Sequence, residues 1–314
     1  MRRRLLLLGY ACLLPMTLAW SAAPGATGAT VWIALSEPGG VYAETAEAVR
    51  AEFERGGGRA EIVIRPWREL PATQGPPPRL TIAVGVGALR GMAEGGVKAP
   101  LLATLVPRAA YLRLAERAAP GLRPHSAVWL DQPVARQFKL LQAALPARRH
   151  IGVLLGPESR LLEPELLQAA ADRNLEVVHA HIDGVEQLPA ALQKTLDVAD
   201  VLLALPDPLI YNGATIQNIL TASYRRRVPL VGFSPAYIRA GALLALYSTP
   251  AQVGTQVGEI MRAVLAGRPL PPPQGPREFS VGVNAEVARS LELAVEGDAA
   301  ARWAGQLRLK ERAP

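Results

Sequence analysis

The sequence is poor in cysteine and in aromatic residues, and it lacks the motifs of several common enzyme classes. Its 314 residues include one Cys, four His and only 5% aromatic residues. A single cysteine, Cys12, excludes a disulfide framework within the chain, so the fold must depend on burial of an apolar core. No G-x-x-x-x-G-K-[ST] sequence is present, and ATP hydrolysis by this chain is therefore not supported.

Basic residues are not gathered into a long run. The formal net charge is +7, but three of the basic residues are Arg2, Arg3 and Arg4. Nucleic-acid binding needs Lys and Arg clustered on one face of a domain, and we therefore expect no nucleic-acid partner. The run Arg225–Arg227 ends a predicted helix, where cations suit the negative end of the helix dipole.

Residues 1–23 have the pattern of an export signal. Three arginines precede an apolar run, Leu5–Trp20, and small residues suitable for cleavage follow around Ser21. The apolar run is shorter than the roughly 20 residues of a membrane-spanning helix, and Pro15 interrupts it. Too little apolar sequence precedes Cys12 for a lipoprotein signal. We expect a cleaved signal peptide and a periplasmic protein.

The rest of the chain alternates short apolar runs with amphipathic segments, which is typical of parallel sheets covered by helices. The predicted strands are Thr30–Ser36, Ala60–Ile64, Leu80–Val84, Leu101–Leu105, Ile151–Leu155, Leu175–Ile182, Val201–Leu205, Pro229–Val231, Leu243–Tyr247 and Glu278–Val283. The clearest predicted helices are Ala43–Phe53, Val134–Leu145, Leu161–Arg173, Val185–Leu196 and Pro250–Leu265. Two such blocks predict an α/β fold of two Rossmann-like, doubly wound lobes with a ligand cleft between them.

The connection between the two blocks and one helix start are the least regular parts of this pattern. Asp131 and Gln132 fall where the chain crosses between the predicted lobes, a place where hinge and ligand contacts coincide in two-lobed proteins. Asp207 follows a predicted strand inside a Pro-Asp-Pro turn. It is either the N-cap of the next helix or a carboxylate that meets a ligand, and Asn212 is an alternative N-cap.

Two glycine-containing turns resemble catalytic or cofactor motifs. The segment Gly232–Ala236 follows a strand like a nucleophile elbow, but Pro235 has no N–H for an oxyanion hole and no His follows His181. Ser234 and Tyr237 remain candidates for hydrogen bonds to a ligand. The segment Gly85–Gly91 has its third glycine one position late for a dinucleotide fingerprint, so a tight strand-to-helix turn is the simpler interpretation.

His179, His181 and Asp183 alternate along a predicted strand and would share one face. Such a set can hold a metal ion, yet the same alternation marks the solvent face of a half-buried or edge strand. With no Cys or further His nearby in the sequence, we expect no metal site and no cofactor.

Several of these stretches together resemble the ABC transporter substrate-binding protein family. They are AVWLDQP, LLQAALPARRHIGVLLGPES, LALPDPLIYNGATIQNIL and RRVPLVGFSPAYIRAGALLALYSTPAQVG. The resemblance covers Leu80–Leu291 and is most specific over Ala204–Gly254. It implies the type I periplasmic binding protein fold, with three crossovers joining lobe 1 (residues 30–127 and 250–265) to lobe 2 (residues 128–249 and 277–292), followed by a C-terminal tail, residues 293–314.

The resemblance also implies a function and a set of site positions. Members of the family bind a small-molecule solute without catalysis and present it to an ABC permease in the inner membrane, and some relatives bind aromatic amino acids. Their ligand contacts come from the loops at strand ends. With the crossover residues, the candidate ligand-binding positions here are Ser36, Val86, Gly87, Thr104, Asp131, Gln132, Asp207, Ser234 and Tyr237. These loops lack an evident Arg or Ser-Thr pair for a ligand carboxylate.

Two other functions remain open at this point. A sensor or accessory subunit uses the same fold to bind a signalling protein instead of serving a permease. An exported α/β enzyme would need a nucleophile–base pair or a strong metal cluster, and neither is evident in the sequence.

Overall fold

The structure analysed is a computed structural model that describes residues 28–70, 77–95, 98–117, 124–295 and 298–312. The predicted signal peptide, residues 1–23, lies outside this described part of the chain. Within the described part, no helix combines the length and the apolar character needed to cross a membrane.

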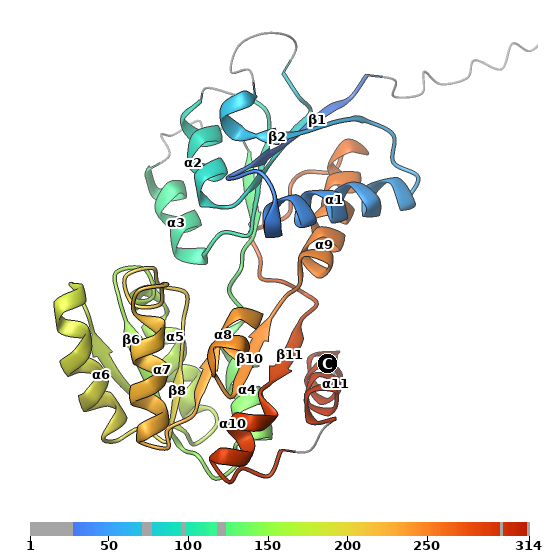
Figure 1. Cartoon of the computed structure of the whole chain (residues 1–314). Coiled ribbons are helices and arrows are strands. Elements are labelled where there is room, and N and C mark those ends of the chain that lie inside the picture. The colour runs from blue at the N-terminus through green and yellow to red at the C-terminus, as the bar shows by residue number, and fades with distance from the viewer. Residues whose placement is uncertain (1–27, 71–76, 96–97, 118–123, 296–297, 313–314) are drawn as a thin grey trace, which may run out of the picture.

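The chain forms two lobes, each built on its own sheet (Figure 1). The first sheet contains β1 (Thr30–Leu35), β2 (Glu61–Pro66), β3 (Leu80–Val84), β4 (Leu101–Thr104) and β5 (His125–Val128). The second contains β6 (His150–Leu155), β7 (Glu176–His181), β8 (Val201–Leu203), β9 (Leu230–Gly232), β10 (Leu244–Tyr247) and β11 (Ser280–Val283). The pairs are parallel except β10–β11, which is antiparallel.

The two sheets share one topology apart from β11, the antiparallel edge strand of the second sheet. The strand orders are β2-β1-β3-β4-β5 and β11-β10-β9-β8-β6-β7, so in each lobe the first strand lies one place in from an edge. The chain winds to that edge and then back across the sheet, which creates a topological switch point between β1 and β3 and between β6 and β8. Ligands of such sheets bind beyond the carboxyl ends of the strands at this point.

The carboxyl edges of the two sheets face each other because the crossovers leave from them. The chain passes from the end of β5 into the second lobe, and from the end of β10 back into the first. The third crossover, residues 266–279, brings the chain from the first lobe to β11. The switch point of each lobe therefore lies on the edge of its sheet that faces the other lobe.

Helices cover both faces of the first sheet. They are α1 (Gly40–Arg55), α2 (Val86–Glu94), α3 (Arg108–Arg117) and α9 (Pro250–Leu265), with a 3₁₀ turn η1 (Trp67–Glu69). α1 and α9 share an apolar cluster with one face of the sheet, and α2 and α3 share another with the opposite face. Strand β1, buried at Val31, Ile33 and Ala34, is apolar on both sides because both sides are covered.

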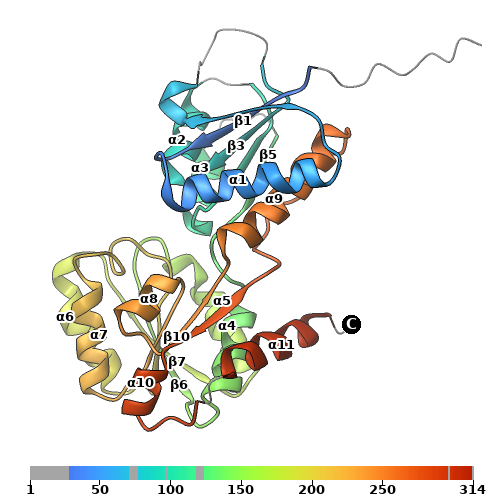
Figure 2. The same ribbon diagram turned by 45° about the vertical axis from the view of Figure 1, so that its right-hand side comes forward.

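Helix α9 belongs to the first lobe although its sequence follows β10 of the second. It lies against α1 (Figure 2), and its Gly254 and Gly258 let the two backbones approach closely. A Cβ atom at Gly258 would lie 2.8 Å from the carbonyl oxygen of Val49 in α1. This close contact anchors the returning chain in the first lobe.

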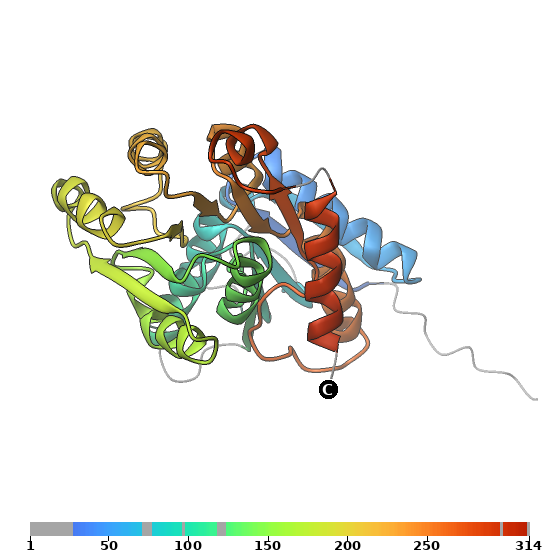
Figure 3. The ribbon, with the colours of Figure 1, turned by 90° about the horizontal axis from the view of Figure 1, so that it is seen from below.

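The second lobe also has helices on both faces of its sheet, as Figure 3 shows from below. They are α4 (Val134–Ala144), α5 (Glu163–Ala171), α6 (Leu188–Leu196), α7 (Ile216–Arg225), α8 (Pro235–Ala240), α10 (Ala285–Ser290) and α11 (Ala299–Arg312), with 3₁₀ turns η2 (Arg160–Leu162) and η3 (Val185–Gln187). α4 and α5 pack on one face, and α6 and α7 on the other. Residues 299–312 of the predicted tail form α11, which packs against α4 and β11 and buries Trp303 and Leu307.

The start of α7 differs from both sequence-based expectations. The helix begins at Ile216, after Thr215, so neither Asp207 nor Asn212 is its N-cap. Asn212 instead accepts a hydrogen bond from the N–H of Ala214 (2.9 Å) within a turn. Short polar side chains form such local turns as readily as helix caps, which is why the sequence could not separate the two.

Gly258→Ala tests the close packing of α1 on α9. Alanine is usually the better helix former by about 1 kcal/mol, but here its methyl group would force the helices apart, so we expect a loss of about 1–3 kcal/mol in unfolding free energy. Gly305→Ala in α11 is the matched control, because nothing lies within 4 Å of the added Cβ, and it should stabilise by about 0.5–1 kcal/mol. Urea unfolding measures the change in unfolding free energy of both variants. If the two substitutions change it in the same direction, the close packing of α1 on α9 is contradicted.

Candidate functional site

A pocket of about 540 Å³ lies at the switch point of the first lobe. Ser36 at the end of β1 and Val86 and Gly87 after β3 line it, so three of the predicted ligand-binding positions meet there. The rest of the lining comes from the start of α1, from η1, from α2 and from the end of β4: Glu37, Tyr42, Trp67, Arg68, Arg90, Gly91, Glu94, Leu105 and Pro107. This volume suits a small molecule.

The turn between β3 and α2 has no room for a side chain. Gly85 has φ +91°, and a Cβ atom there would lie 2.5 Å from Ser36 Oγ and 2.6 Å from Tyr42 Cε1. The Ser36 hydroxyl accepts a hydrogen bond from the N–H of Ala88 (2.9 Å), so a side chain from β1 caps the first turn of α2. The glycine therefore fixes the backbone of Val86 and Gly87 at the pocket wall.

Trp67, Arg68 and Arg90 also line this pocket, and the sequence analysis did not select them. Arg68 lies over the Trp67 ring at 4.6 Å from its centroid. Neither Arg68 nor Arg90 has an ion-pair partner among the residues that the structure describes. Glu37 and Glu94 bring carboxylates to the same pocket. Its wall thus offers an aromatic surface and charged groups of both signs.

Thr104 lies just outside this pocket. It is fully buried at the end of β4, and its hydroxyl oxygen has no hydrogen-bond partner among the described residues. Its carbonyl oxygen accepts the N–H of Gly85 (2.8 Å), so Thr104 supports the glycine turn through its backbone. The next residue, Leu105, is the one that lines the pocket.

Asp131 lies at a smaller cavity between the lobes, of about 120 Å³. Its carboxylate accepts the backbone N–H of Arg108, the first residue of α3, at 2.6 Å. Burial raises the pKa of Asp131 to about 6 because desolvation disfavours the charged form, while the hydrogen bond from Arg108 acts in the opposite direction. Asp131 therefore holds the first crossover against the first lobe.

Gln132 connects all three crossovers. Its side-chain amide donates a hydrogen bond to the hydroxyl of Ser248 in the second crossover (2.9 Å). The Ser248 hydroxyl in turn donates to the carbonyl oxygen of Glu278 in the third (2.6 Å). This chain of hydrogen bonds places Gln132 at the hinge.

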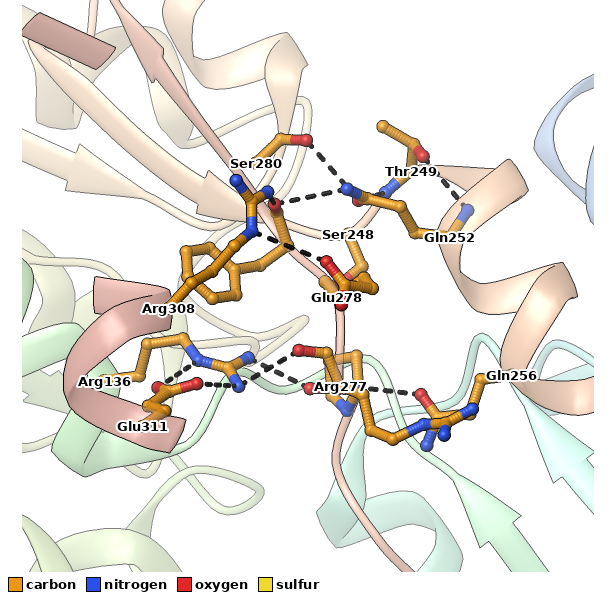
Figure 4. Close-up of polar contacts among 12 residues, drawn as sticks. Arg136, Ser248, Thr249, Gln252, Gln256, Arg277, Glu278, Ser280, Arg308 and Glu311 are labelled. Carbon is orange, nitrogen blue, oxygen red and sulfur yellow. Dashed lines mark hydrogen bonds and ion pairs between the residues drawn. The ribbon is translucent and has the colours of Figure 1, made fainter. Parts of the chain in front are cut away.

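Arg136 in α4 reinforces the same place (Figure 4). Its guanidinium is 6% exposed and donates to the carbonyl oxygens of Pro276 and Arg277 in the third crossover. It also forms a two-point ion pair with Glu311 of α11 (2.7 and 2.8 Å) and lies over the Phe279 ring. The C-terminal helix is thereby attached to the hinge.

The carboxylate of Asp207 forms hydrogen bonds within its own lobe. Its side chain is 2% exposed and accepts hydrogen bonds from the N–H groups of Glu158 (3.0 Å), Ser159 (2.9 Å) and Leu209 (3.1 Å), and from the Ser159 hydroxyl (3.0 Å). It thus fastens the loop after β6 to the loop after β8, across the switch point of the second lobe. Its role as a ligand contact remains a prediction.

Ser234 and Tyr237 lie after β9 in the second lobe, and neither lines the two pockets described above. Ser234 is half-buried, and its side chain makes no capping hydrogen bond to α8. The Tyr237 ring packs against Phe233 (centroids 4.6 Å apart) and Tyr211 (6.5 Å). Tyr237 is therefore part of an aromatic cluster in the core of this lobe.

Two ion pairs join the lobes beside the crossovers. Arg108 of α3 pairs with Glu165 of α5 at 2.7 Å, and Arg113 of α3 pairs with Glu158. All four side chains are partly exposed, so each pair contributes at most about 1 kcal/mol. They hold α3 close to the start of α5 without locking the lobes together.

A group of three side chains in the second lobe has the right atoms for a metal ion. Glu163, His179 and His181 bring their carboxylate and imidazole atoms within 4.8 Å of one another. Asp183, the third residue of the sequence-based set, pairs instead with Arg160 (2.7 Å). The strand alternation correctly placed the two histidines together, but the carboxylate comes from a helix.

Comparison with known proteins agrees with this architecture. Residues 128–299 match the ABC transporter substrate binding protein family, which is more than half of the chain, and the chain belongs to that family. This match confirms the family resemblance seen in the sequence. As a member of the family, the protein is a binding protein and not an enzyme. No curated protein sequence matches the chain.

Solved structures show the same two-lobed fold. The ligand-free, open form of a Clostridium difficile substrate binding protein with adhesive properties is 17% identical (TM-score 0.64; 87% of this chain, 97% of that one). An ABC domain from Streptococcus pneumonia in complex with L-Trp is 15% identical (TM-score 0.62; 87% and 96%). A conserved domain protein from Vibrio cholerae is 19% identical (TM-score 0.62; 87% and 98%). The predicted type I periplasmic binding protein fold is confirmed.

Asp131→Asn tests the buried carboxyl at the crossover. In the unfolded chain an Asp titrates near pH 4, so between about pH 6 and pH 4 the folded protein binds the extra proton and gains stability as the pH falls. Above pH 6 the buried charge is a cost. The variant should therefore be more stable by about 2 kcal/mol at pH 7.5, with the advantage shrinking toward pH 4.5.

Urea unfolding at both pH values measures this difference. Asp172→Asn, at an exposed position on the end of α5, is the control and should leave stability nearly unchanged at each pH. An advantage of Asp131→Asn that is the same at pH 7.5 and pH 4.5 would contradict the raised pKa.

Proposed function

We propose that this protein is the exported solute-binding component of an ABC-type uptake system, and that it takes up a small zwitterionic solute between its lobes. The observation that carries the proposal is the pocket of about 540 Å³ at the first switch point, lined by Trp67 and by Arg68 and Arg90, which form no ion pair with any residue that the structure describes. A guanidinium presents two N–H groups in the geometry of a carboxylate, which makes Arg the residue best suited to hold one.

The charges of the pocket indicate which solutes fit. Arg68 and Arg90 suit a carboxylate, whereas Glu37 and Glu94 suit an ammonium group. Trp67 and Tyr42 provide aromatic surface for the remainder of the solute. An amino acid with an apolar or aromatic side chain satisfies all three. The L-Trp complex of the Streptococcus pneumonia protein supports amino acids as first probes.

The second lobe supplies the opposite wall in this proposal. Its switch point is the loop Gly156–Ser159, which Asp207 holds in place, and Ser234 lies at the end of the neighbouring strand β9. Rotation about the crossovers would bring this edge toward the pocket of the first lobe. The solute then contacts both lobes and stabilises the closed form by its differential affinity for it.

The remaining parts of the proposal rest on the sequence and on the family. The arginines and apolar run of residues 1–23 support export to the periplasm. Family membership supports delivery of the solute to an ABC permease in the inner membrane. A transport assay with the intact system, with and without this protein, tests delivery separately from binding.

Arg90→Ala and Trp67→Ala test the pocket. A thermal-shift screen of L-amino acids should find at least one that raises the Tm of the natural protein. Each substitution should weaken binding of that solute about tenfold or more in isothermal titration calorimetry, because a charge-assisted hydrogen bond or a stacking surface is lost. Arg65→Ala, at an exposed arginine of β2 outside the pocket, is the control and should bind as the natural protein does.

Two outcomes would contradict the proposal. If no amino acid in the screen shifts the Tm, the zwitterion assignment is wrong. If a solute binds but Arg90→Ala and Arg65→Ala bind it equally well, the solute does not occupy this pocket.

A further inference from the structure

The edge strand of the second sheet carries two histidines that converge on one carboxylate. Glu163 is the first residue of α5, and its two carboxylate oxygens approach the Nε2 atoms of His179 (3.0 Å) and His181 (2.8 Å) on β7. The two imidazole rings lie 5.4 Å apart, centroid to centroid. None of the three residues lines either pocket described above.

The register of β7 explains why the three meet. His179 and His181 pair with Val153 and Leu155 of β6, which are buried against α5 on that face of the sheet. The histidines therefore lie on the α5 side and continue the row begun by Val177, which packs on the same cluster. At this end of the row the strand is covered by the first turn of α5, and Glu163 of that turn contacts both histidines.

This donor set is one that divalent zinc prefers. Imidazole nitrogen and carboxylate oxygen are both ordinary zinc ligands, with bonds of about 2.0–2.2 Å. In a tetrahedral complex with such bonds, neighbouring ligand atoms lie about 3.3 Å apart. The two histidine nitrogens lie 3.0 and 2.8 Å from different oxygens of Glu163, and the three ligand atoms all lie within 4.8 Å of one another, so side-chain rotations would bring them to this spacing. The side chains are 22%, 31% and 43% exposed for Glu163, His179 and His181, which leaves a path for the ion and a fourth position for water.

We propose that Glu163, His179 and His181 form a zinc-binding site that joins the edge strand β7 to the start of α5. The strand and the helix otherwise meet through apolar contacts, and an edge strand has one unpaired side. A metal ion held by both elements fixes that edge. It also fixes the first turn of α5, which carries the interlobe ion pair of Glu165 with Arg108.

Zinc chloride titrated by calorimetry tests this site on protein that carries no polyhistidine tag and has been stripped of metal with a chelator. The natural protein should bind one zinc ion per chain, and saturating zinc should raise its Tm by about 5 °C. The double variant His179→Ala/His181→Ala should bind about 100-fold more weakly or not at all. Glu163→Gln keeps the size of the side chain but removes its charge and replaces one acceptor oxygen by an NH2 donor, and it should weaken binding at least about tenfold.

Asp183→Asn is the matched control. Asp183 alternates with the two histidines in the sequence, yet its carboxylate pairs with Arg160, so the variant should bind zinc within about twofold of the natural protein. Since the ligand side chains are partly exposed, we expect the metal-free variants to unfold near the Tm of the natural protein.

Three results would overturn the proposal. The first is the absence of saturable zinc binding by the natural protein, which would leave Glu163 as a hydrogen-bond acceptor for two imidazoles. The second is unchanged binding by the double histidine variant. The third is an equal loss in Asp183→Asn and Glu163→Gln, which would mean that zinc responds to the general negative charge of this surface.

Discussion

The three crossovers are held together by a short chain of hydrogen bonds, and the relation between the lobes depends on it. Gln132, Ser248 and the carbonyl oxygen of Glu278 come from three segments far apart in the sequence, yet each is bonded to the next. Arg136 adds two more carbonyl oxygens of the third segment and carries a buried charge that Glu311 balances. A buried guanidinium with every partner in place is costly to disturb, so these contacts hold the three segments together.

With this arrangement each lobe can stay rigid while its position relative to the other lobe changes. Each lobe has apolar clusters on both faces of its sheet, and each switch point is fixed from within its own lobe: by Gly85 and Ser36 in the first, by Asp207 in the second. The two ion pairs that join α3 to the second lobe beside the crossovers are partly exposed, and such pairs exchange easily with water. Binding surfaces that are prepared in advance lose less entropy when the solute arrives.

The sequence predicted the fold well because the fold rests on local pattern. Apolar runs buried on both faces predict strands wherever they occur. The helix Pro250–Leu265 was predicted with the ends that the structure has, and there Thr249 and Gln252 form a capping box with Pro250 as the first helical residue. The site was harder, since its residues meet through long-range packing. Trp67 and Arg68 reach the pocket from a 3₁₀ turn after β2, and Arg90 from the second turn of α2, positions that no strand-end rule selects.

Asp207 and the histidine group show the same limit. A carboxylate after a strand can cap a helix, bind a ligand or hold a loop in place. That Asp207 holds a loop is seen only from its hydrogen bond with Ser159, which is 48 residues away in the sequence. The alternation of His179 and His181 was visible, but Glu163 is recognised only once the register of β7 and the start of α5 are known.

The junction between β10 and α9 has a mechanical consequence. The strand ends at Tyr247 and the helix starts at Pro250, so only Ser248 and Thr249 separate a rigid element of one lobe from a rigid element of the other. The helix of 16 residues is about 24 Å long at 1.5 Å per residue, and Gly254 and Gly258 seat it tightly on α1. It therefore works as a lever: a turn of about 20° at Ser248 would swing its far end by about 8 Å and carry the whole first lobe with it.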